Sequence, residues 1–178
     1  MNIYIIDMQG FKAKSTFIIK EMAIIPLNSY NIPKLYLFKA PHDFERFSPK
    51  NNKSNRWLER YYHRLKWNHG VIAYDELDNI LNGVLSNAKR VYVKGFEKIS
   101  WLRAHNITHE IIDLESMGCP ALKSLSRQPA CAHHSFNIDA ECAMSNVLSL
   151  REWMLANGLP HVSLLPPPPP SDSIDEVG

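Results

Sequence analysis

Two cysteines and a histidine in the C-terminal third of the chain carry its sharpest chemical signal. Cys131, His134 and Cys142 follow the spacing C-x2-H-x7-C. Two soft thiolates and one imidazole suit Zn²⁺, which takes four N, S or O ligands in a tetrahedron at structural sites. The chain has only three cysteines, so finding two of them around one histidine favours a metal site. The segment therefore predicts bound zinc, with simple burial of the two thiols as the alternative.

The spacing does not fix the fourth ligand of such a site. His133, Cys119 and a carboxylate all have the required ligand chemistry. Glu21 lies within the otherwise apolar segment FIIKEMAII, where an unpaired charge is costly to bury. A bound cation would remove that cost, whereas an edge position in a sheet would let Glu21 face solvent instead.

Segment 46–67 is the second informative region, because basic and aromatic residues are interleaved there and Glu59 is its one acidic residue. The pattern fits an amphipathic surface helix whose aromatic rings pack inward while its cations stay solvated. It also fits contact with nucleic acid, although the formal net charge of +2 does not by itself indicate such a partner. The candidate nucleic-acid contacts are Lys53, Arg56, Arg60, Arg64 and Lys66.

The expected order of the strands and helices that position these residues predicts an α/β domain. Strands are expected at 2–7, 15–27, 34–39, 90–94 and 108–114, and helices at 57–65, 75–86, 96–102 and 139–155, with a polar loop at 48–55. The first three strands are expected to be antiparallel, and the later β-α-β arrangement implies a parallel pair with a right-handed crossover. Asp139 is the expected N-cap of the last helix, which would place Cys142 in a first turn that favours its thiolate.

This element order, together with local motifs, resembles the ribonuclease H-like exonucleases of the DEDD type. The segment IYIIDMQG resembles their first motif, with Asp7 at the first carboxylate position and Gln9 at the second. The segment VKGFEKISWL resembles the second motif, with Lys98 at the aspartate position. In the last helix, Glu141 stands at the general-base histidine position and Asn146 at the final aspartate position. The resemblance implies a mixed five-stranded sheet flanked by helices, with three antiparallel N-terminal and two parallel C-terminal strands.

The altered positions predict the loss of nuclease chemistry. That family activates water with two divalent ions held by clustered carboxylates. Glutamine and asparagine offer neutral oxygens, and a lysine adds positive charge where the protein should supply negative charge. The degenerate positions, none of which we expect to be catalytic, are Asp7, Gln9, Lys98 and Asn146. The alternative is a metal-dependent nuclease acting on single-stranded nucleic acid through Asp7, with partners such as Glu97, Glu141 or Asp113.

The four candidate ligand positions, Glu21, Cys131, His134 and Cys142, carry a second resemblance, to the Maelstrom domain. That family is a ribonuclease H-like fold without the exonuclease carboxylates, and it carries a Glu-Cys-His-Cys zinc motif. The resemblance covers residues 1–156 in element order and implies that Glu21 joins Cys131, His134 and Cys142 as a zinc ligand. It further implies association with single-stranded RNA, weak nuclease activity at most, and a role in small-RNA or mobile-element biology.

Bulk properties bound the domain organisation and the compartment. No stretch approaches the roughly 18 apolar residues of a membrane-spanning helix, and the N-terminus lacks a secretory signal pattern. An odd number of cysteines argues against a disulfide framework. We expect a soluble intracellular protein, cytoplasmic or nuclear, with a zinc-binding domain at 1–158. Residues 159–178, which include five consecutive prolines, are expected to be a disordered tail that acts as a spacer or binds a protein partner.

Overall fold

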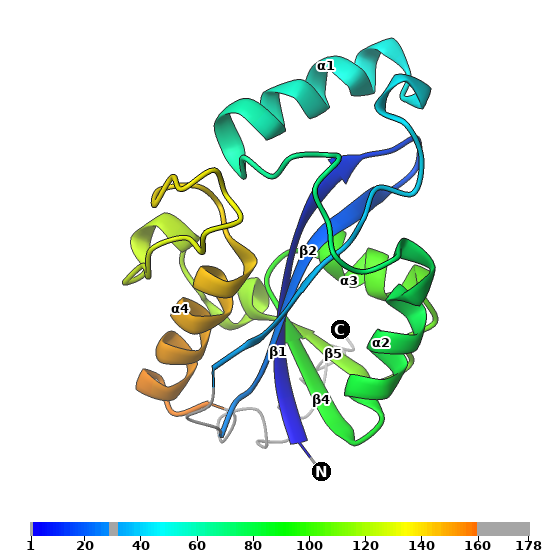
Figure 1. The fold of residues 1–178 in the computed structure, drawn as a ribbon. Helices are drawn as coiled ribbons and strands as arrows, with labels where there is room; N and C mark the ends of the chain where they lie inside the picture. The colour runs from blue at the N-terminus through cyan, green and yellow to red at the C-terminus, as the bar shows by residue number, and fades with distance from the viewer. Residues whose placement is uncertain (1, 29–31, 160–178) are drawn as a thin grey trace, which may run out of the picture.

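A five-stranded mixed sheet forms the centre of the protein (Figure 1). The computed structural model describes residues 2–28 and 32–159. The strands are β1 (Asn2–Lys12), β2 (Phe17–Pro26), β3 (Lys34–Leu37), β4 (Ala88–Val93) and β5 (Glu110–Asp113). They lie in the order β3-β2-β1-β4-β5, with β2 antiparallel to β1 and β3, and with β1, β4 and β5 parallel. The predicted α/β architecture is confirmed.

Helices cover both faces of this sheet, so most side chains of its central strands are buried on both sides. The longer helices are α1 (Pro49–Trp57), α2 (Leu77–Leu85), α3 (Phe96–Ala104) and α4 (Ala143–Ala156). Helices α2 and α3 lie on one face of the sheet and α4 lies on the other (Figure 1). In β1, Ile6 and Met8 pack in the cluster that contains α2 and α3, whereas Ile5 packs in the cluster that contains α4. Because side chains alternate along a strand, Asp7 and Gln9 share the α4 face with Ile5.

A β-bulge interrupts the pairing of β1 with β2 opposite Gln9 and Gly10, where Lys20 of β2 is the extra residue. A Cβ atom on Gly10 would lie 2.1 Å from the backbone oxygen of Ile18, so the strands approach each other here only because this residue is glycine. A bulge bends its strand and increases the local twist. Beyond it, β1 packs against α1 and carries Phe11 into a small core with Trp67.

Helix α1 begins earlier than its aromatic residues predict, so the predicted loop at 48–55 is largely helical. Ser48 is the N-cap, because its hydroxyl accepts a hydrogen bond from the Asn51 amide at 3.2 Å, and proline occupies the first turn. A π-helical turn, η2 (Leu58–Tyr62), continues the helix. The buried residue of α1 is Asn55, whose side chain bonds to both the backbone amide and the carbonyl of Lys12.

The amphipathic interpretation expects the aromatic rings of this helical segment to pack inward, but three of them do not. Trp57, Tyr61 and Tyr62 are 54%, 60% and 39% exposed. The inward positions are taken by two polar side chains, Asn55 and His63, which have no solvent exposure. The amphipathic interpretation is therefore wrong for these three rings, which lie on the surface.

Helix α4 begins at Ala143, later than the predicted start at Asp139, and its N-cap is Cys142. The Asp139 amide bonds to the Asn137 side chain at 3.0 Å in the turn before the helix. The side-chain partner of the first helical amide is the buried carboxylate of Glu21, which accepts from Ala143 N at 2.7 Å. A residue of β2 thus performs the capping role that local sequence assigned to Asp139.

Short 3-10 turns connect the remaining elements: η1 (Phe44–Arg46), η3 (Tyr74–Glu76), η4 (Leu114–Met117) and η5 (Leu122–Ser124). Within residues 2–28 and 32–159, no helix has the length and apolar character needed to cross a membrane. Leu159, the first residue of the predicted tail, is buried in the cluster beneath α4. The rest of the predicted tail, 160–178, lies outside the described residues.

Candidate metal centre and basic groove

Glu21, Cys131, His134 and Cys142 converge at the start of α4. Their ligand atoms all lie within 4.8 Å of one another. Glu21 comes from β2, Cys131 and His134 from the loop before α4, and Cys142 from the N-cap. Glu21, His134 and Cys142 have no solvent exposure, and Cys131 is partly buried. These four residues could hold a metal ion.

Both ring nitrogens of His134 face oxygen acceptors, which suits either an imidazolium that donates to both or a neutral ring that binds a cation. Nδ1 lies 2.5 Å from the His63 carbonyl oxygen, and Nε2 lies 2.8 Å from Glu21 Oε2. A neutral imidazole has one N–H, so donation from Nδ1 to His63 leaves a lone pair on Nε2 that faces the carboxylate. A metal ion bound by Nε2 and Glu21 would satisfy both groups. A carbonyl partner on the other ring nitrogen is typical of metal-binding histidines.

The two thiols are also crowded against other ionisable groups. The Cys131 amide donates to Cys142 Sγ at 3.4 Å, and Cys131 Sγ lies 3.5 Å from Glu21 Oε2. The hydrogen bond from the Cys131 side chain outweighs burial and lowers the pKa of Cys142 to about 4, while the same contact raises the pKa of Cys131. Burial raises the pKa of Glu21. Because metal ligands must be deprotonated, a divalent cation would let these crowded groups ionise together.

Glu21 joins the cluster, and the other two candidates for the fourth ligand do not. Cys119 packs in the apolar cluster beneath α4, with its thiol 3.6 Å from the carbonyl oxygen of Pro120. His133 is exposed to solvent. Strand β2 lies between β1 and β3, so Glu21 does not occupy an edge position.

A second polar cluster, centred on Asp7, lies on the same face of the sheet. Asp7 is fully buried and accepts hydrogen bonds from Asn146 Nδ2 at 2.9 Å and from Gln9 Nε2 at 3.4 Å. The ammonium group of Lys98 forms an ion pair with the other carboxylate oxygen. The four degenerate positions named from the sequence are therefore brought together around one carboxylate. Their only cationic side chain, Lys98, neutralises it.

The other carboxylates considered for a nuclease centre have different surroundings. Glu97 is exposed on α3. Asp113 Oδ1 accepts two backbone amide hydrogen bonds, at 2.9 and 3.0 Å. Glu141 pairs with Arg127 at 3.3 Å, and its second oxygen lies 3.4 Å from Asn146 Nδ2. Glu141 is thus the carboxylate of this group that reaches the Asp7 cluster.

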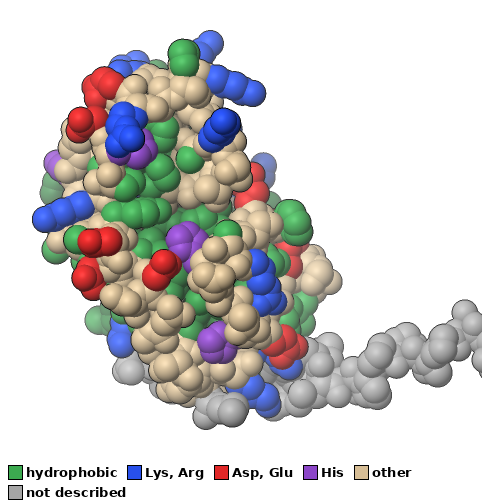
Figure 2. Space-filling view, turned by 90° about the vertical axis from the view of Figure 1, so that its right-hand side faces the viewer, with side chains coloured by type: hydrophobic (Ala, Val, Ile, Leu, Met, Phe, Trp, Pro, Cys, Tyr) green, Lys and Arg blue, Asp and Glu red, His purple; other side chains and the backbone are tan. Residues whose placement is uncertain are grey.

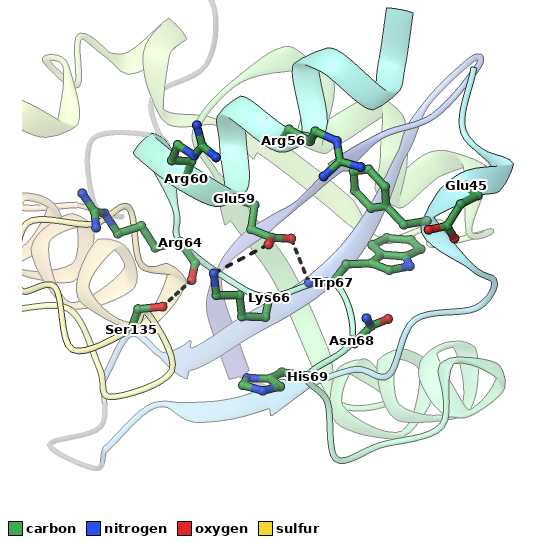
Figure 3. Close-up of a pocket in the computed structure, with 11 residues that line it drawn as sticks. Glu45, Arg56, Glu59, Arg60, Arg64, Lys66, Trp67, Asn68, His69 and Ser135 are labelled. Atoms are coloured by element: carbon green, nitrogen blue, oxygen red, sulfur yellow. Dashed lines mark hydrogen bonds and ion pairs between the residues drawn. The ribbon is translucent and has the colours of Figure 1, made fainter. Parts of the chain in front are cut away.

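A groove of about 740 Å³ runs beside α1 and η2 (Figure 3). Arg56, Arg60, Arg64 and Lys66 line it, so four of the predicted nucleic-acid contacts share one surface. The remaining lining residues are Phe44, Glu45, Glu59, Trp67, Asn68, His69 and Ser135. Lys53 instead lines a separate pocket. Figure 2 shows Lys and Arg side chains gathered around the end of the molecule that carries α1.

Basic and acidic side chains are unevenly distributed along this groove. Glu59 lies 3.7 Å from the Lys66 ammonium group and also accepts from the Trp67 amide at 3.2 Å. Arg60 and Arg64 lie at the end of the groove opposite Glu45 (Figure 3). Clustered cations beside aromatic rings provide the chemistry that binds phosphates and bases.

The loop that carries the metal-ligand candidates also binds the backbone at the C-terminal end of η2. Three consecutive backbone carbonyls there accept hydrogen bonds from this loop. The pairs are Tyr62 O with the Glu141 amide at 3.1 Å, His63 O with His134 Nδ1 at 2.5 Å, and Arg64 O with the Ser135 hydroxyl at 3.3 Å. Arg64 and Ser135 have φ angles of 56° and 53°, in the left-handed region that side-chain-bearing residues rarely adopt. The loop therefore fixes the backbone from which Arg64 extends into the groove.

His63 and Ser135 were not identified from the sequence, although they link the two sites. Each bridge joins residues that are 71 positions apart in the chain. No local spacing or periodicity signals such a contact, because it depends on how the loop packs against η2.

Comparison of the chain with protein-family models, with curated proteins and with solved structures finds no match. The function of these sites must therefore be inferred from their own geometry and chemistry.

Proposed function

We propose that this protein is a catalytically degenerate, ribonuclease H-like domain that contains a structural zinc ion and binds single-stranded RNA. The convergence of Glu21, Cys131, His134 and Cys142 within 4.8 Å is the observation that carries the proposal. The basic groove supports its RNA-binding part. A role in small-RNA or mobile-element biology rests on the resemblance to the Maelstrom domain alone.

Zinc is the metal that this ligand set favours. Two thiolates and an imidazole suit Zn²⁺, whereas Mg²⁺ and Ca²⁺ prefer oxygen ligands. Four protein ligands leave no open position, which is the arrangement of a structural site. The order Glu21, Cys131, His134, Cys142 along the chain is also the order of the Glu-Cys-His-Cys motif of the Maelstrom domain. The ion would join β2, the loop before α4 and the start of α4.

Metal analysis of the purified full-length chain tests the zinc assignment. We expect about one equivalent of zinc, because structural sites bind tightly and are coupled to folding. Cys131→Ser and Cys142→Ser should each lose the metal and lower the melting temperature. Cys119→Ser is the matched control and should retain it. Less than about half an equivalent in the wild-type protein, purified without chelator, would contradict the assignment.

The groove cations support binding to the phosphate backbone of RNA. If its four basic side chains each contact a phosphate, the logarithm of the binding constant should fall with the logarithm of salt concentration with a slope of about −3. Fluorescence anisotropy with a labelled single-stranded RNA at several salt concentrations measures this slope. Arg64→Ala should weaken binding and reduce the slope by about 1. Lys89→Ala, an exposed cation at the start of β4, is the control. Failure to bind at low salt would overturn this part of the proposal.

The ion pair between Asp7 and Lys98 supports the absence of nuclease activity. A two-metal nuclease needs clustered negative charge at this position, and here the ammonium group of Lys98 already balances Asp7. We expect no cleavage of single-stranded RNA or DNA with Mg²⁺ or Mn²⁺. Cleavage that disappears in Asp7→Ala would favour the nuclease alternative, whereas cleavage that persists would indicate a contaminant.

A further inference from the structure

Three aromatic side chains form an exposed surface, here called the aromatic ledge, on α1 and η2. The ledge consists of Trp57, Tyr61 and Tyr62, which are 54%, 60% and 39% exposed. The rings of Trp57 and Tyr62 are stacked, with centroids 6.0 Å apart and an interplanar angle of 23°. The ring of Tyr61 lies 6.4 Å from that of Trp57. Large aromatic rings gathered on a surface commonly mark a binding site, because burying them would be favourable.

Cations flank two rings of this ledge, Trp57 and Tyr61. A pocket of about 290 Å³ beside Trp57 is lined by Lys12 and Lys53, together with Ser54 and Leu58. On the other side, the guanidinium group of Arg60 lies 6.0 Å from the centroid of the Tyr61 ring. No acidic side chain lines the pocket beside Trp57, within the described residues. The surface therefore combines exposed π-faces with positive charge.

The ledge and the basic groove lie next to each other on one helical segment. Arg56 and Arg60 are four residues apart, and so are Trp57 and Tyr61, which follow them directly in the chain. Each pair therefore lies along one side of the helical segment, and the two sides are neighbours. Arg56 and Arg60 line the groove. A polymer whose anionic backbone follows the groove would therefore bring its side groups within reach of the ledge.

We infer that the aromatic ledge stacks unpaired nucleobases of a single strand whose phosphates contact the groove. The inference rests on the proposed function and specifies which part of the RNA is recognised. Exposed aromatic rings beside cations match single-stranded nucleic acid, because every base has a π-face and every residue of the backbone has a charge. A duplex keeps its bases stacked inside and cannot offer them. An acidic protein partner would need the cations but not the exposed π-faces.

Binding of oligomers with and without bases tests the inference. The probes are a labelled adenosine 12-mer and an abasic ribose-phosphate 12-mer, which carry the same number of phosphates. Stacking of one base is worth roughly 1–3 kcal/mol, so we expect the abasic strand to bind the wild-type chain about 5- to 150-fold more weakly. Trp57→Leu should weaken binding of the adenosine strand by a similar factor and leave binding of the abasic strand unchanged.

Tryptophan fluorescence provides a second readout. Trp57 is 54% exposed, whereas Trp67 and Trp101 are 2% and 1% exposed. The fourth tryptophan, Trp153 in α4, is partly buried against the cluster on the other face of the sheet. Base stacking should quench the emission of Trp57 on titration with the adenosine strand, and Trp57→Leu should remove most of this quenching. Phe96→Leu, which alters an exposed aromatic ring on α3, is the control and should bind like wild type. The exposed positions of both rings allow either variant to fold.

The outcomes separate this inference from the function on which it rests. Equal affinities for the adenosine and abasic strands, with no effect of Trp57→Leu but weakened binding by Arg64→Ala, would overturn base stacking and retain RNA binding by the groove. If neither strand binds at low salt, the proposed RNA-binding function fails as well.

Discussion

Removing the Lys98 ammonium group should destabilise the fold, because the buried Asp7 carboxylate would lose its counter-ion. Asp7 has no solvent exposure, and its other side-chain partners are the neutral amides of Asn146 at 2.9 Å and Gln9 at 3.4 Å. Breaking a buried ion pair by removing one partner typically costs about 3–5 kcal/mol. The Lys98 side chain is 19% exposed, so water partly hydrates the site. We therefore expect Lys98→Met to lower the free energy of unfolding by about 3 kcal/mol.

A double-mutant cycle separates the ion pair from other effects of the substitution. Asp7→Asn combined with Lys98→Met removes both charges, so the double variant should recover about 2 kcal/mol relative to Lys98→Met alone. Lys94→Met is the matched control, because the Lys94 side chain is also largely buried, at 9% exposed, but its partner at 3.3 Å, Glu115, is 57% exposed and stays hydrated when the lysine is removed. A pair with such an exposed partner contributes about 0–1 kcal/mol.

Urea unfolding followed by circular dichroism, in one buffer of fixed zinc concentration, measures these differences. With a urea dependence of about 2 kcal/mol per molar, a loss of 3 kcal/mol shifts the unfolding midpoint by about 1.5 M. A Lys98→Met midpoint within about 0.3 M of wild type would refute the reasoning, because Asp7 would then tolerate burial without its counter-ion.

Three further predictions concern the metal loop, the bulge and the first helix. Removal of the proposed zinc ion by a chelator should lower the proposed affinity for single-stranded RNA by roughly 5-fold or more, since the loop would then hold the Arg64 backbone less firmly. Fluorescence anisotropy checks this, and an unchanged affinity of metal-free, folded protein would contradict the coupling. Gly10→Ala should lower the free energy of unfolding by about 3 kcal/mol or more in urea, because its Cβ would meet the Ile18 carbonyl at 2.1 Å; a loss under about 1 kcal/mol would show that the bulge relaxes. Ser48→Ala should cost about 1 kcal/mol in the same assay through loss of the N-cap bond, and no measurable change would mean that the cap adds nothing.

The order of strands and helices could be predicted because it depends on local patterns. Apolar runs in β1, β2 and β4 and the spacing of Leu77, Leu81 and Leu85 in α2 are visible in short windows of sequence. Helix α1 could not be placed in this way. Its buried residue is Asn55, which is held by the backbone of Lys12, a contact across 43 positions of the chain.

The exposure of the rings in the aromatic ledge could not be predicted from local sequence patterns either. A pattern of Trp and Tyr at helical spacing indicates one face of a helix, but it does not indicate whether that face meets a core. Here the core beside α1 is already filled by Phe11, Phe47 and Trp67, so Trp57 and Tyr61 remain on the surface.

The sequence by itself determined the chemistry of Cys131, His134 and Cys142 as candidate metal ligands, because these residue types stand at short spacings. The absence of carboxylates at Gln9, Lys98 and Asn146 was predicted only through the resemblance to the DEDD-type exonucleases. Only the tertiary structure decided that Glu21 of β2 reaches Cys131, His134 and Cys142, and that Lys98 of α3 neutralises Asp7 of β1. Strand register places Glu21 opposite Gln9, and the packing of α4 over this face brings the loop ligands to it. These positions depend on contacts between distant segments, which no local pattern specifies.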